Sequence, residues 1–190
     1  MKIDKITDEK IIILYKNGNQ EVFKVLIDRY TTPLYNFIAR ITNKNEAPDI
    51  VQETFIKVWK NINRFDSSKA SFKTWIFFIA RNVATDFLRK KSFLLFSDIE
   101  KVDDETIKSF EENISDESLL PEKILQKLED SEFLNRILEK LNINYKEILI
   151  LHYQEELTFK EISKILNKNL NTVKSQHHRA ILKLREILEG

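Results

Sequence analysis

Apolar residues recur along the chain at three- and four-residue spacing, the pattern of helices that bury one face. In the first ninety residues, helix-breaking or helix-starting residues interrupt this pattern at Asn17–Asn19, Pro33 and Asn43–Asn45. We expect Pro33 to open a new helix, because proline fits the first helical turn and disrupts a helix interior. The predicted helices are 12–15, 22–30, 33–41, 46–61 and 72–91, with a polar loop over 63–71.

Residues 92–120 lack this periodicity and are rich in Ser, Asp and Glu, which predicts a linker. Pro121 marks the return of the helical pattern, with helices expected over 122–141 and 145–153 and two more near the C-terminus. Only two Gly and three Pro occur in 190 residues, which favours an all-α protein over a sheet protein. We therefore predict two small helical domains, 1–91 and 121–190, joined by an acidic linker over 92–120.

The stretch from Leu157 to Leu188 predicts a helix-turn-helix. Thr158 and Glu161 have the spacing of a capping box, Asn167 tolerates the left-handed conformation of the turn, and Asn171 or Thr172 caps the second helix. The second helix carries no acid from 170 to 185, as entry into a DNA major groove requires. Its inner side is predicted to contain Val173, Ala180, Ile181 and Leu184, and its outer, DNA-contacting side Thr172, Lys174, Ser175, His178 and Arg179. The alternative is an ordinary helical hairpin with a solvated face, which the agreement of capping, turn and charge disfavours.

In the predicted helix over 72–91, basic residues alternate with aromatic residues, and the polar loop before the helix adds further cations. Cations can follow the phosphates of single-stranded DNA while aromatic rings stack on its bases. One face should pack inward through Phe72, Ile76, Ile79, Ala80, Val83 and Phe87, and the other should carry Thr74, Phe78, Arg81, Asn82, Thr85 and Arg89, with Trp75 at its edge. For any single aromatic, a place in the core is the competing interpretation.

The predicted helix over 46–61 has a polar side with an apolar residue in its middle. Helical spacing gathers Val51, Phe55, Val58 and Trp59 on a core face, and Asp49, Gln52, Glu53, Lys57 and Lys60 on the other side, with Ile56 among them. An apolar residue ringed by hydrogen-bonding side chains is typical of the centre of a protein interface. A lone exposed apolar residue is also ordinary, so both interpretations remain open.

The net charge of +1 conceals a sorting of charge along the chain. Residues 57–91 carry nine Lys or Arg against two Asp, 92–130 carry twelve acids against four Lys, and 170–190 carry four bases against two acids. Two basic blocks that coincide with the two motifs favour a polyanionic partner. The absence of Cys rules out disulfides and thiolate metal sites and fits a reducing cytoplasm.

Other chemistry finds little support in the chain. His177 and His178 are adjacent, so on a helix they diverge and cannot hold one ion together. No nucleophile–base–orienter set is apparent, and we predict no enzyme activity, no metal and no cofactor. The N-terminus does not have the pattern of a signal peptide, and no apolar run is long enough for a membrane span, so we expect a cytoplasmic protein.

These motifs, taken in order, resemble bacterial RNA polymerase sigma factors of the extracytoplasmic-function (ECF) group of the sigma-70 family. The resemblance rests on residues 49–59, 72–75, 79–82 and 86–90 in the first half, and on 157–162, 172–175 and 178–180 in the second. It implies two helical domains, region 2 and region 4, that bind core RNA polymerase and direct initiation at promoters. Asn167 and Asn171 stand where the family often has Gly, Gln176 replaces a frequent Arg, and His177 replaces a common aliphatic residue.

The resemblance also implies partners for the predicted surfaces. Asp49, Gln52, Glu53 and Ile56 would contact the β′ clamp helices of the polymerase, and region 4 would sit on the β flap and read the minus-35 element. The minus-10 element would be melted and held by Arg64, Lys69, Phe72, Lys73, Trp75, Arg81, Asn82 and Arg89. An anti-sigma factor is a common partner of the family.

Two alternatives belong to other classes. A helix-turn-helix regulator that is not a polymerase subunit would bind duplex DNA tightly by itself. A helical adaptor that binds only protein, or an anti-sigma-like regulator, would tolerate charge reversal at Lys174 or Arg179.

Overall fold

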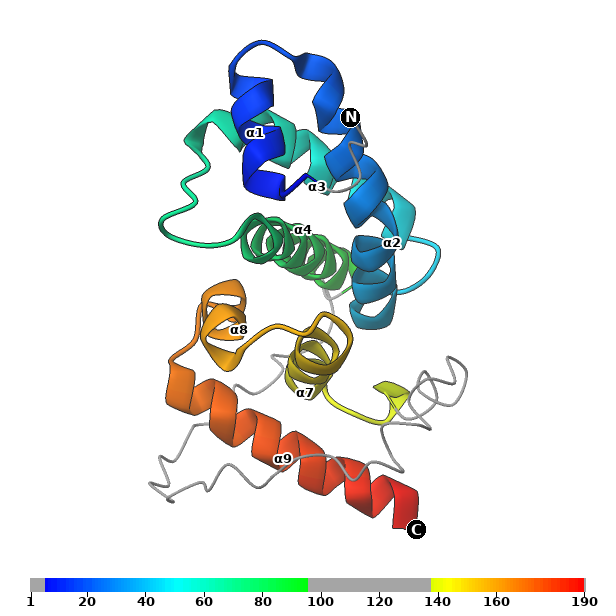
Figure 1. Cartoon of the computed structure of the whole chain (residues 1–190). Helices are drawn as coiled ribbons and strands as arrows, with labels where there is room; N and C mark the ends of the chain where they lie inside the picture. The colour runs from blue at the N-terminus through cyan, green and yellow to red at the C-terminus, as the bar shows by residue number, and fades with distance from the viewer. Residues whose placement is uncertain (1–5, 96–137, 190) are drawn as a thin grey trace.

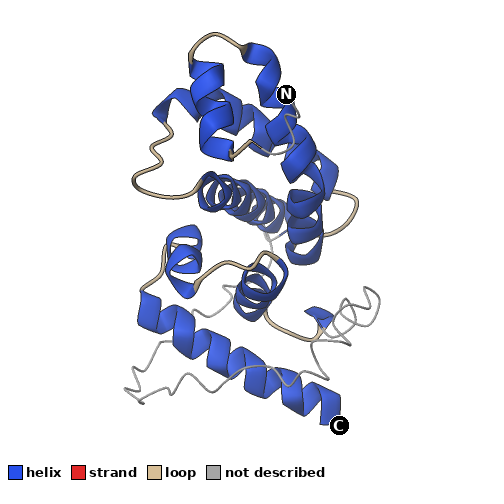
Figure 2. Cartoon of the chain, viewed as in Figure 1, coloured by secondary structure: helices blue, strands red, loops and turns tan. Residues whose placement is uncertain are grey.

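The computed structural model describes residues 6–95 and 138–189, and every regular element in these ranges is helical (Figure 2). This confirms the predicted all-α class. The predicted linker over 92–120 lies outside the described residues except for its first four, as does most of the helix predicted over 122–141.

The elements are α1 (Asp8–Lys16), the 3₁₀ turn η2 (Gln20–Val22), α2 (Phe23–Ile41), α3 (Ala47–Asn61), the 3₁₀ turn η3 (Ile62–Arg64), α4 (Phe72–Leu95), α7 (Ile143–Leu149), the π-helical turn η4 (Ile150–Gln154), α8 (Phe159–Leu166) and α9 (Leu170–Glu189).

Helices α1 to α4 form the N-terminal unit, residues 6–95, around one core (Figure 1). Aromatic rings join its helices: Phe37 of α2 meets Phe77 of α4 edge to face, and Tyr30 of α2 meets Phe72 of α4 in the same way. Asp8 near the N-terminus accepts hydrogen bonds from Arg29 and from the Tyr30 hydroxyl, which holds α1 against α2. Helix α4 is thus central, with α2 and α3 packed on it.

The break predicted at Pro33 is absent, because α2 continues through the proline as one helix from Phe23 to Ile41. An interior proline removes one helical hydrogen bond and costs about 3 kcal/mol. Here a single apolar stripe runs along both halves of the helix, and each member is buried: Leu26, Tyr30, Leu34, Phe37, Ile38 and Ile41. Burying a side chain of this size is worth about 1.5–3 kcal/mol, so continuing the stripe outweighs the proline penalty.

The helix-turn-helix forms largely as its sequence predicts, in the C-terminal unit, residues 138–189. Thr158 and Glu161 make both hydrogen bonds of the capping box, and Asn167 ends α8 in the left-handed conformation, with φ of 52°. The predicted cap of the second helix was wrong by two to three residues. Helix α9 starts at Leu170, and the Asn169 side chain accepts a hydrogen bond from the backbone N–H of Asn171 at 2.9 Å.

The C-terminal unit packs directly on the N-terminal unit. Helix α8 contacts α4, and α7 contacts α2, so α7 and α8 lie between α4 and α9 (Figure 1). Across 6–95 and 138–189, no helix combines the length and apolar character needed to cross a bilayer.

Candidate functional site

The outer face of α9 carries the residues predicted to contact duplex DNA. Lys174 and Arg179 are exposed, while Thr172, Ser175 and His178 are half-buried. The opposite side of the helix is buried through Val173, Ala180, Ile181 and Leu184, as predicted. Sequence periodicity therefore predicts the buried side of α9 correctly and leaves Lys174 and Arg179 open, whereas Thr172, Ser175 and His178 are partly covered.

His177 lies on the buried side of α9, within an aromatic cluster. Its ring packs on Phe159 and His152, its Nε2 lies 3.1 Å from the Tyr153 hydroxyl, and the residue is 3% exposed. Burial, reinforced by the neighbouring His152 and His178, lowers the pKa of His177 to about 4. A neutral imidazole thus occupies a core position of this unit, and His177 points away from the outer face.

On α4 the structure divides the predicted strand-binding residues between two sides of the helix. Trp75 and Asn82 face α3, where they line a pocket of about 370 Å³ together with Arg64. We call it the α3–α4 pocket; its other lining residues are Lys57, Asn61 and Ile79. Two of the lining residues are cationic, two carry amides and one is an indole. The pocket therefore offers charge, hydrogen bonding and an aromatic surface within one hollow.

Lys73 and Arg81 lie on the opposite side of α4, against the C-terminal unit, where each is paired with a glutamate. Thr74, predicted on an open face, is 2% exposed and covered by the same unit. The prediction for Thr74 was wrong because the helix pattern cannot indicate that a second unit packs on that side.

Phe72 is in the core and cannot stack on a base in this structure. It is 0% exposed, with its ring against Tyr30, Phe65 and Trp75. The core interpretation therefore holds for Phe72, and it is removed from the strand-binding set. Trp75 keeps part of its indole accessible.

The remaining cations of the set, Lys69 and Arg89, are on the surface. Lys69 pairs with Asp66 at 3.7 Å and Arg89 with Asp86 at 3.2 Å, each within its own segment. Exposed pairs of this kind contribute little to stability, so both cations are available to phosphates at small cost.

Helix α3 exposes a mixed face formed by Asp49, Gln52, Glu53, Ile56 and Trp59. Trp59 was predicted on the core side, and this was wrong: its side is open and the residue is 54% exposed. Val51 and Val58 are buried as predicted, and Ala47, Ile50 and Thr54 join them, because α3 packs on both α2 and α4. Gln52, Ile56 and Trp59 follow one another at i, i+4 and i+7, so the exposed apolar surface is larger than the sequence pattern indicated.

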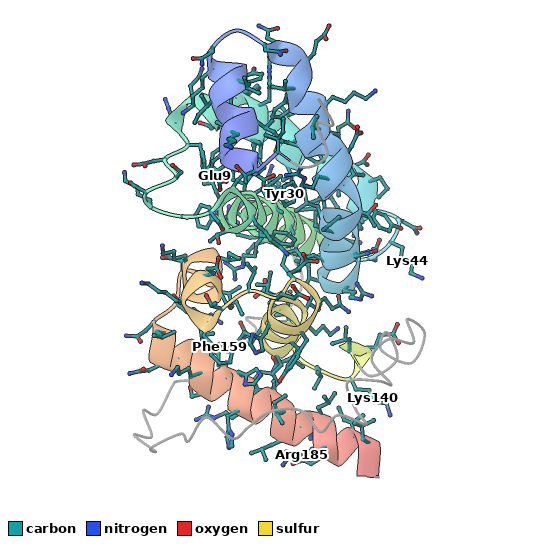
Figure 3. All side chains as sticks on the ribbon, in the orientation of Figure 1. Glu9, Tyr30, Lys44, Lys140, Phe159 and Arg185 are labelled. Atoms are coloured by element: carbon teal, nitrogen blue, oxygen red, sulfur yellow. The ribbon has the colours of Figure 1, made fainter. Side chains whose placement is uncertain are left out.

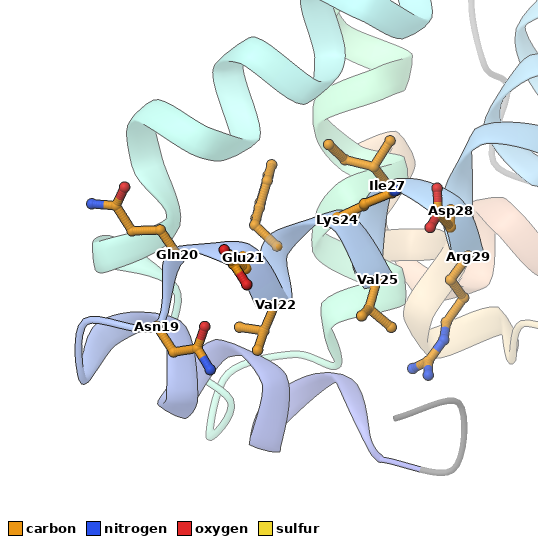
Figure 4. A pocket seen from close by; sticks show the side chains of 10 residues that line it. Asn19, Gln20, Glu21, Val22, Lys24, Val25, Ile27, Asp28 and Arg29 are labelled. Atoms are coloured by element: carbon orange, nitrogen blue, oxygen red, sulfur yellow. The ribbon is translucent and has the colours of Figure 1, made fainter. Parts of the chain in front are cut away.

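A second hollow, of about 1040 Å³, lies at the start of α2 (Figure 4). Residues 19–25 and 27–29 line it, and Figure 4 shows Val25 and Arg29 on one side of the helix and Ile27 on the other. None of the predicted site residues belongs to it. The α3–α4 pocket is therefore the hollow that coincides with predicted chemistry.

Comparison with known proteins places the two units in one family. The family Sigma-70 region 2 matches residues 26–93, and Sigma-70, region 4 matches residues 134–184. The chain is 35% identical over 181 residues to the ECF RNA polymerase sigma factor SigW of Bacillus subtilis (strain 168), covering 95% of this chain and 96% of SigW. It is 28% identical to the ECF RNA polymerase sigma-E factor of Escherichia coli (strain K12), over 93% of this chain and 92% of that protein.

Solved structures share the fold. CnrH, determined in complex with the cytosolic domain of CnrY, matches with a TM-score of 0.66 at 21% identity, over 96% of this chain and 97% of CnrH. The sigma factor RpoE, determined with the anti-sigma factor NepR from Bartonella quintana, matches with a TM-score of 0.65 at 24% identity, over 88% of this chain and 96% of RpoE.

The chain belongs to the ECF RNA polymerase sigma factors of the sigma-70 family. It is thus a transcription initiation factor that binds core RNA polymerase and promoter DNA.

Proposed function

We propose that promoter-specific initiation uses three separate surfaces of this chain. The mixed face of α3 binds the polymerase, and the α3–α4 pocket holds a base of the melted minus-10 strand. The outer face of α9 reads the minus-35 element. The observation that carries this proposal is the α3–α4 pocket, because it gathers Arg64, Trp75 and Asn82 from separate parts of the chain.

The α3–α4 pocket suits one unstacked base with its phosphate. Its volume of about 370 Å³ falls in the range of about 300–1000 Å³ that is typical of sites for small ligands. The Trp75 indole offers a stacking surface, and the Asn61 and Asn82 amides can both donate to and accept from a base edge. Lys57 and Arg64 supply positive charge for the flanking phosphates. Capturing an unstacked base in this way offsets part of the cost of opening the duplex.

The α3 face suits a helical protein partner. Ile56 and Trp59 provide adjacent apolar anchors, 43% and 54% exposed, and Asp49, Gln52 and Glu53 surround them. Aromatic anchors inside a polar rim are typical of binding hot spots. We assign this face to the β′ clamp helices and add Trp59 to the residues predicted from the sequence. Glu53 pairs with Lys57 at 3.1 Å in the free chain, and this exposed pair can open at little cost.

On α9, Lys174 and Arg179 can donate to guanine or to phosphate, and Ser175 and His178 can contact base edges or backbone. In this proposal the β flap of the polymerase binds the C-terminal unit. RNA synthesis itself is carried out by the polymerase, in the cytoplasm. Two solved relatives are bound to CnrY and to the anti-sigma factor NepR, respectively, and we extend an anti-sigma partner to this chain on that basis.

The proposal is tested by transcription in vitro with core polymerase on a genomic DNA library, reading out start sites. Trp75→Ala should weaken use of the minus-10 element by about 1–3 kcal/mol, the contribution of one stacked base. The matched control is Phe78→Ala on the same helix, because Phe78 is 37% exposed and lies outside the pocket. Equal activity of the two variants would contradict the assignment of the pocket.

Polymerase binding is tested separately by pull-down with core enzyme. Glu53→Lys should reduce binding while leaving the helical circular dichroism unchanged, because Glu53 is exposed. Tight and specific binding of the chain to duplex promoter DNA without polymerase would instead favour an independent helix-turn-helix regulator.

A further inference from the structure

The turn between α8 and α9 carries a lysine that belongs to none of the three surfaces proposed above. Lys168 lies two residues before α9, directly after the left-handed Asn167. Its side chain is half-buried and reaches two other parts of the C-terminal unit. The ammonium donates to the side-chain carbonyl of Asn144 on α7 at 2.8 Å and to that of Gln176 on α9 at 3.1 Å. One lysine therefore joins α7, the turn and α9.

Neutral amides hold this ammonium, and no carboxylate pairs with it. Within residues 6–95 and 138–189, Lys168 forms no ion pair, and the nearby Glu147 is already paired with Arg81 at 3.0 Å. Burial lowers the pKa of Lys168, and Glu147 opposes that shift while Arg81 adds to it. An ammonium has three N–H donors, and the two amides use two of them. Lys168 therefore retains its positive charge and one donor for an anionic ligand.

The position of Gln176 shows which surface this charge adjoins. Residues three and four apart are neighbours on a helix, so Gln176 lies beside Thr172 and Arg179, both predicted to contact DNA. Lys174 and Gln176 are two residues apart, or about 200° around the helix, so they lie toward opposite edges of the outer face. One edge carries the exposed Lys174 as a cation of its own. The other edge carries the Gln176 amide, and Lys168 brings a positive charge to it.

The geometry of a helix-turn-helix gives a charge at this edge an acceptor. Figure 3 shows side chains filling the space between α9 and the helices α7 and α8, and others projecting from the far side of α9. In this motif the second helix lies in the major groove and the first crosses the sugar-phosphate backbone. The turn that joins them therefore lies beside the backbone. Phosphates border the groove on both sides, so a cation at either edge of α9 can bind one.

We propose that Lys168 binds a phosphate of the duplex at the edge of the minus-35 element, and that Asn144 and Gln176 position its ammonium. This inference rests on the proposed reading of that element by α9. Because every nucleotide has a phosphate, the contact adds affinity and fixes the register of α9 without selecting a base. Lys168 is thus a DNA-binding residue outside the set predicted from the sequence.

The test measures binding of the holoenzyme, assembled from the full chain and core polymerase, to duplex DNA that contains the minus-35 element. Each phosphate that a lysine neutralises contributes about 0.9 to the slope of log affinity against log salt concentration. Lys168→Ala should therefore reduce this slope by about 0.9, so that its affinity deficit shrinks about 3.5-fold between about 0.05 and about 0.2 M salt. The deficit should be the same for every minus-35 sequence, unlike that of Arg179→Ala.

Uncharged linkages locate the contact on the DNA. A methylphosphonate removes the charge of one phosphate, and it is introduced at one position at a time along both strands of the element. At the phosphate that Lys168 binds, this replacement should weaken binding of the unmodified chain and leave the affinity of Lys168→Ala unchanged. If every replacement weakened both proteins equally, the proposal would be overturned.

Two further variants on α9 control for charge. Lys183→Ala removes an exposed lysine that pairs with Glu186 at 2.7 Å, and its salt slope should equal that of the unmodified chain. Gln176→Arg combined with Lys168→Ala places a cation directly on the same edge of α9 and should restore the slope. A folded double variant that keeps the reduced slope would overturn the assignment of this edge to a phosphate.

A purely structural role of Lys168 gives a different result. Lys168 links α7 to α9, so its removal is also expected to lower thermal stability. Lys168→Gln removes the charge but keeps N–H donors beside the two amides, which preserves part of this link. If Lys168→Gln is folded by circular dichroism and retains the full salt slope, Lys168 supports only the packing and the proposal is wrong.

The unmodified chain separates this inference from the proposed function. Scrambling the base pairs of the minus-35 element should weaken its binding if α9 reads that element. No effect of scrambling, together with a reduced slope in Lys168→Ala, would contradict the reading of the element by α9 and support the backbone contact. An effect of scrambling, together with an unchanged slope in Lys168→Ala, would overturn the contact and support the proposed function.

Discussion

Helices α4 and α9 both carry residues predicted to contact DNA, but the two sets of residues are distributed differently over their helices. On α9 none of the predicted residues belongs to the buried stripe, and Lys174 and Arg179 are fully open. On α4 they are divided between a pocket beside α3, the N-terminal core and the interface with the C-terminal unit. The difference follows from packing: α9 lies at the edge of the described structure, whereas α4 is contacted by α2, α3 and α8.

On a peripheral helix, the spacing of apolar residues predicts which side chains are buried, because only one stripe of the helix packs against a core. A central helix meets several neighbours, and its residues acquire roles that depend on which neighbour lies opposite. Substitutions on the two helices should therefore have effects of different kinds, on stability where a face is buried and on recognition where it is open.

The largest effect is expected at Phe72, which separates a core role from a DNA role on α4. Phe72→Ala should lower the free energy of unfolding by about 3–5 kcal/mol, the usual cost of deleting a buried phenyl ring. Chemical denaturation measures this, with Phe78→Ala as the exposed control on the same helix. If Phe72→Ala left stability intact and weakened only strand binding, the original sequence prediction would be right after all.

On α9, His177 should make stability depend on pH. The folded chain holds His177 neutral, with its pKa lowered to about 4, whereas the unfolded chain takes up a proton near 6.5. The stabilisation is therefore complete above pH 6.5 and declines as the pH falls toward 4, by about 3 kcal/mol in all. His177→Leu should flatten this part of the pH profile in denaturation experiments, and an unchanged profile would place the titrating group elsewhere.

Arg179→Ala tests the open side of α9. It should weaken recognition of the minus-35 element by about 1–3 kcal/mol, because an arginine that contacts a base or phosphate is lost. Transcription from promoters with altered minus-35 sequences measures the change in preference. Lys183→Ala is the control, since Lys183 pairs with Glu186 on the surface of the same helix. Unaltered promoter preference in Arg179→Ala would remove Arg179 from the recognition set.

The smallest effect is expected at the start of α9. Asn169→Ala removes the side chain that accepts from the N–H of Asn171, and loss of such a cap costs about 1 kcal/mol. Thermal denaturation of this variant should show a modest loss that Asn171→Ala does not reproduce. An equal loss in both variants would restore the sequence prediction that the helix begins later.

The sequence alone determined the family, the helical class and most of α9. Local rules were sufficient for the capping box of Thr158 and Glu161 and for the left-handed turn at Asn167, because both involve neighbours in the chain. The inner residues of α9 followed from helical spacing against a single core. The motifs in both halves are sufficient to indicate the sigma factors.

Packing between helices accounts for four features that the sequence pattern does not predict: the continuity of α2 through Pro33, the exposure of Trp59, the burial of Phe72 and Thr74, and the pairing of Lys73 and Arg81 with glutamates. Each of these depends on residues far away in sequence. Periodicity gives the direction of a side chain from its own helix but not the neighbour that it meets, and in this chain that neighbour decides whether the residue lies in the core, in the α3–α4 pocket or between the two units.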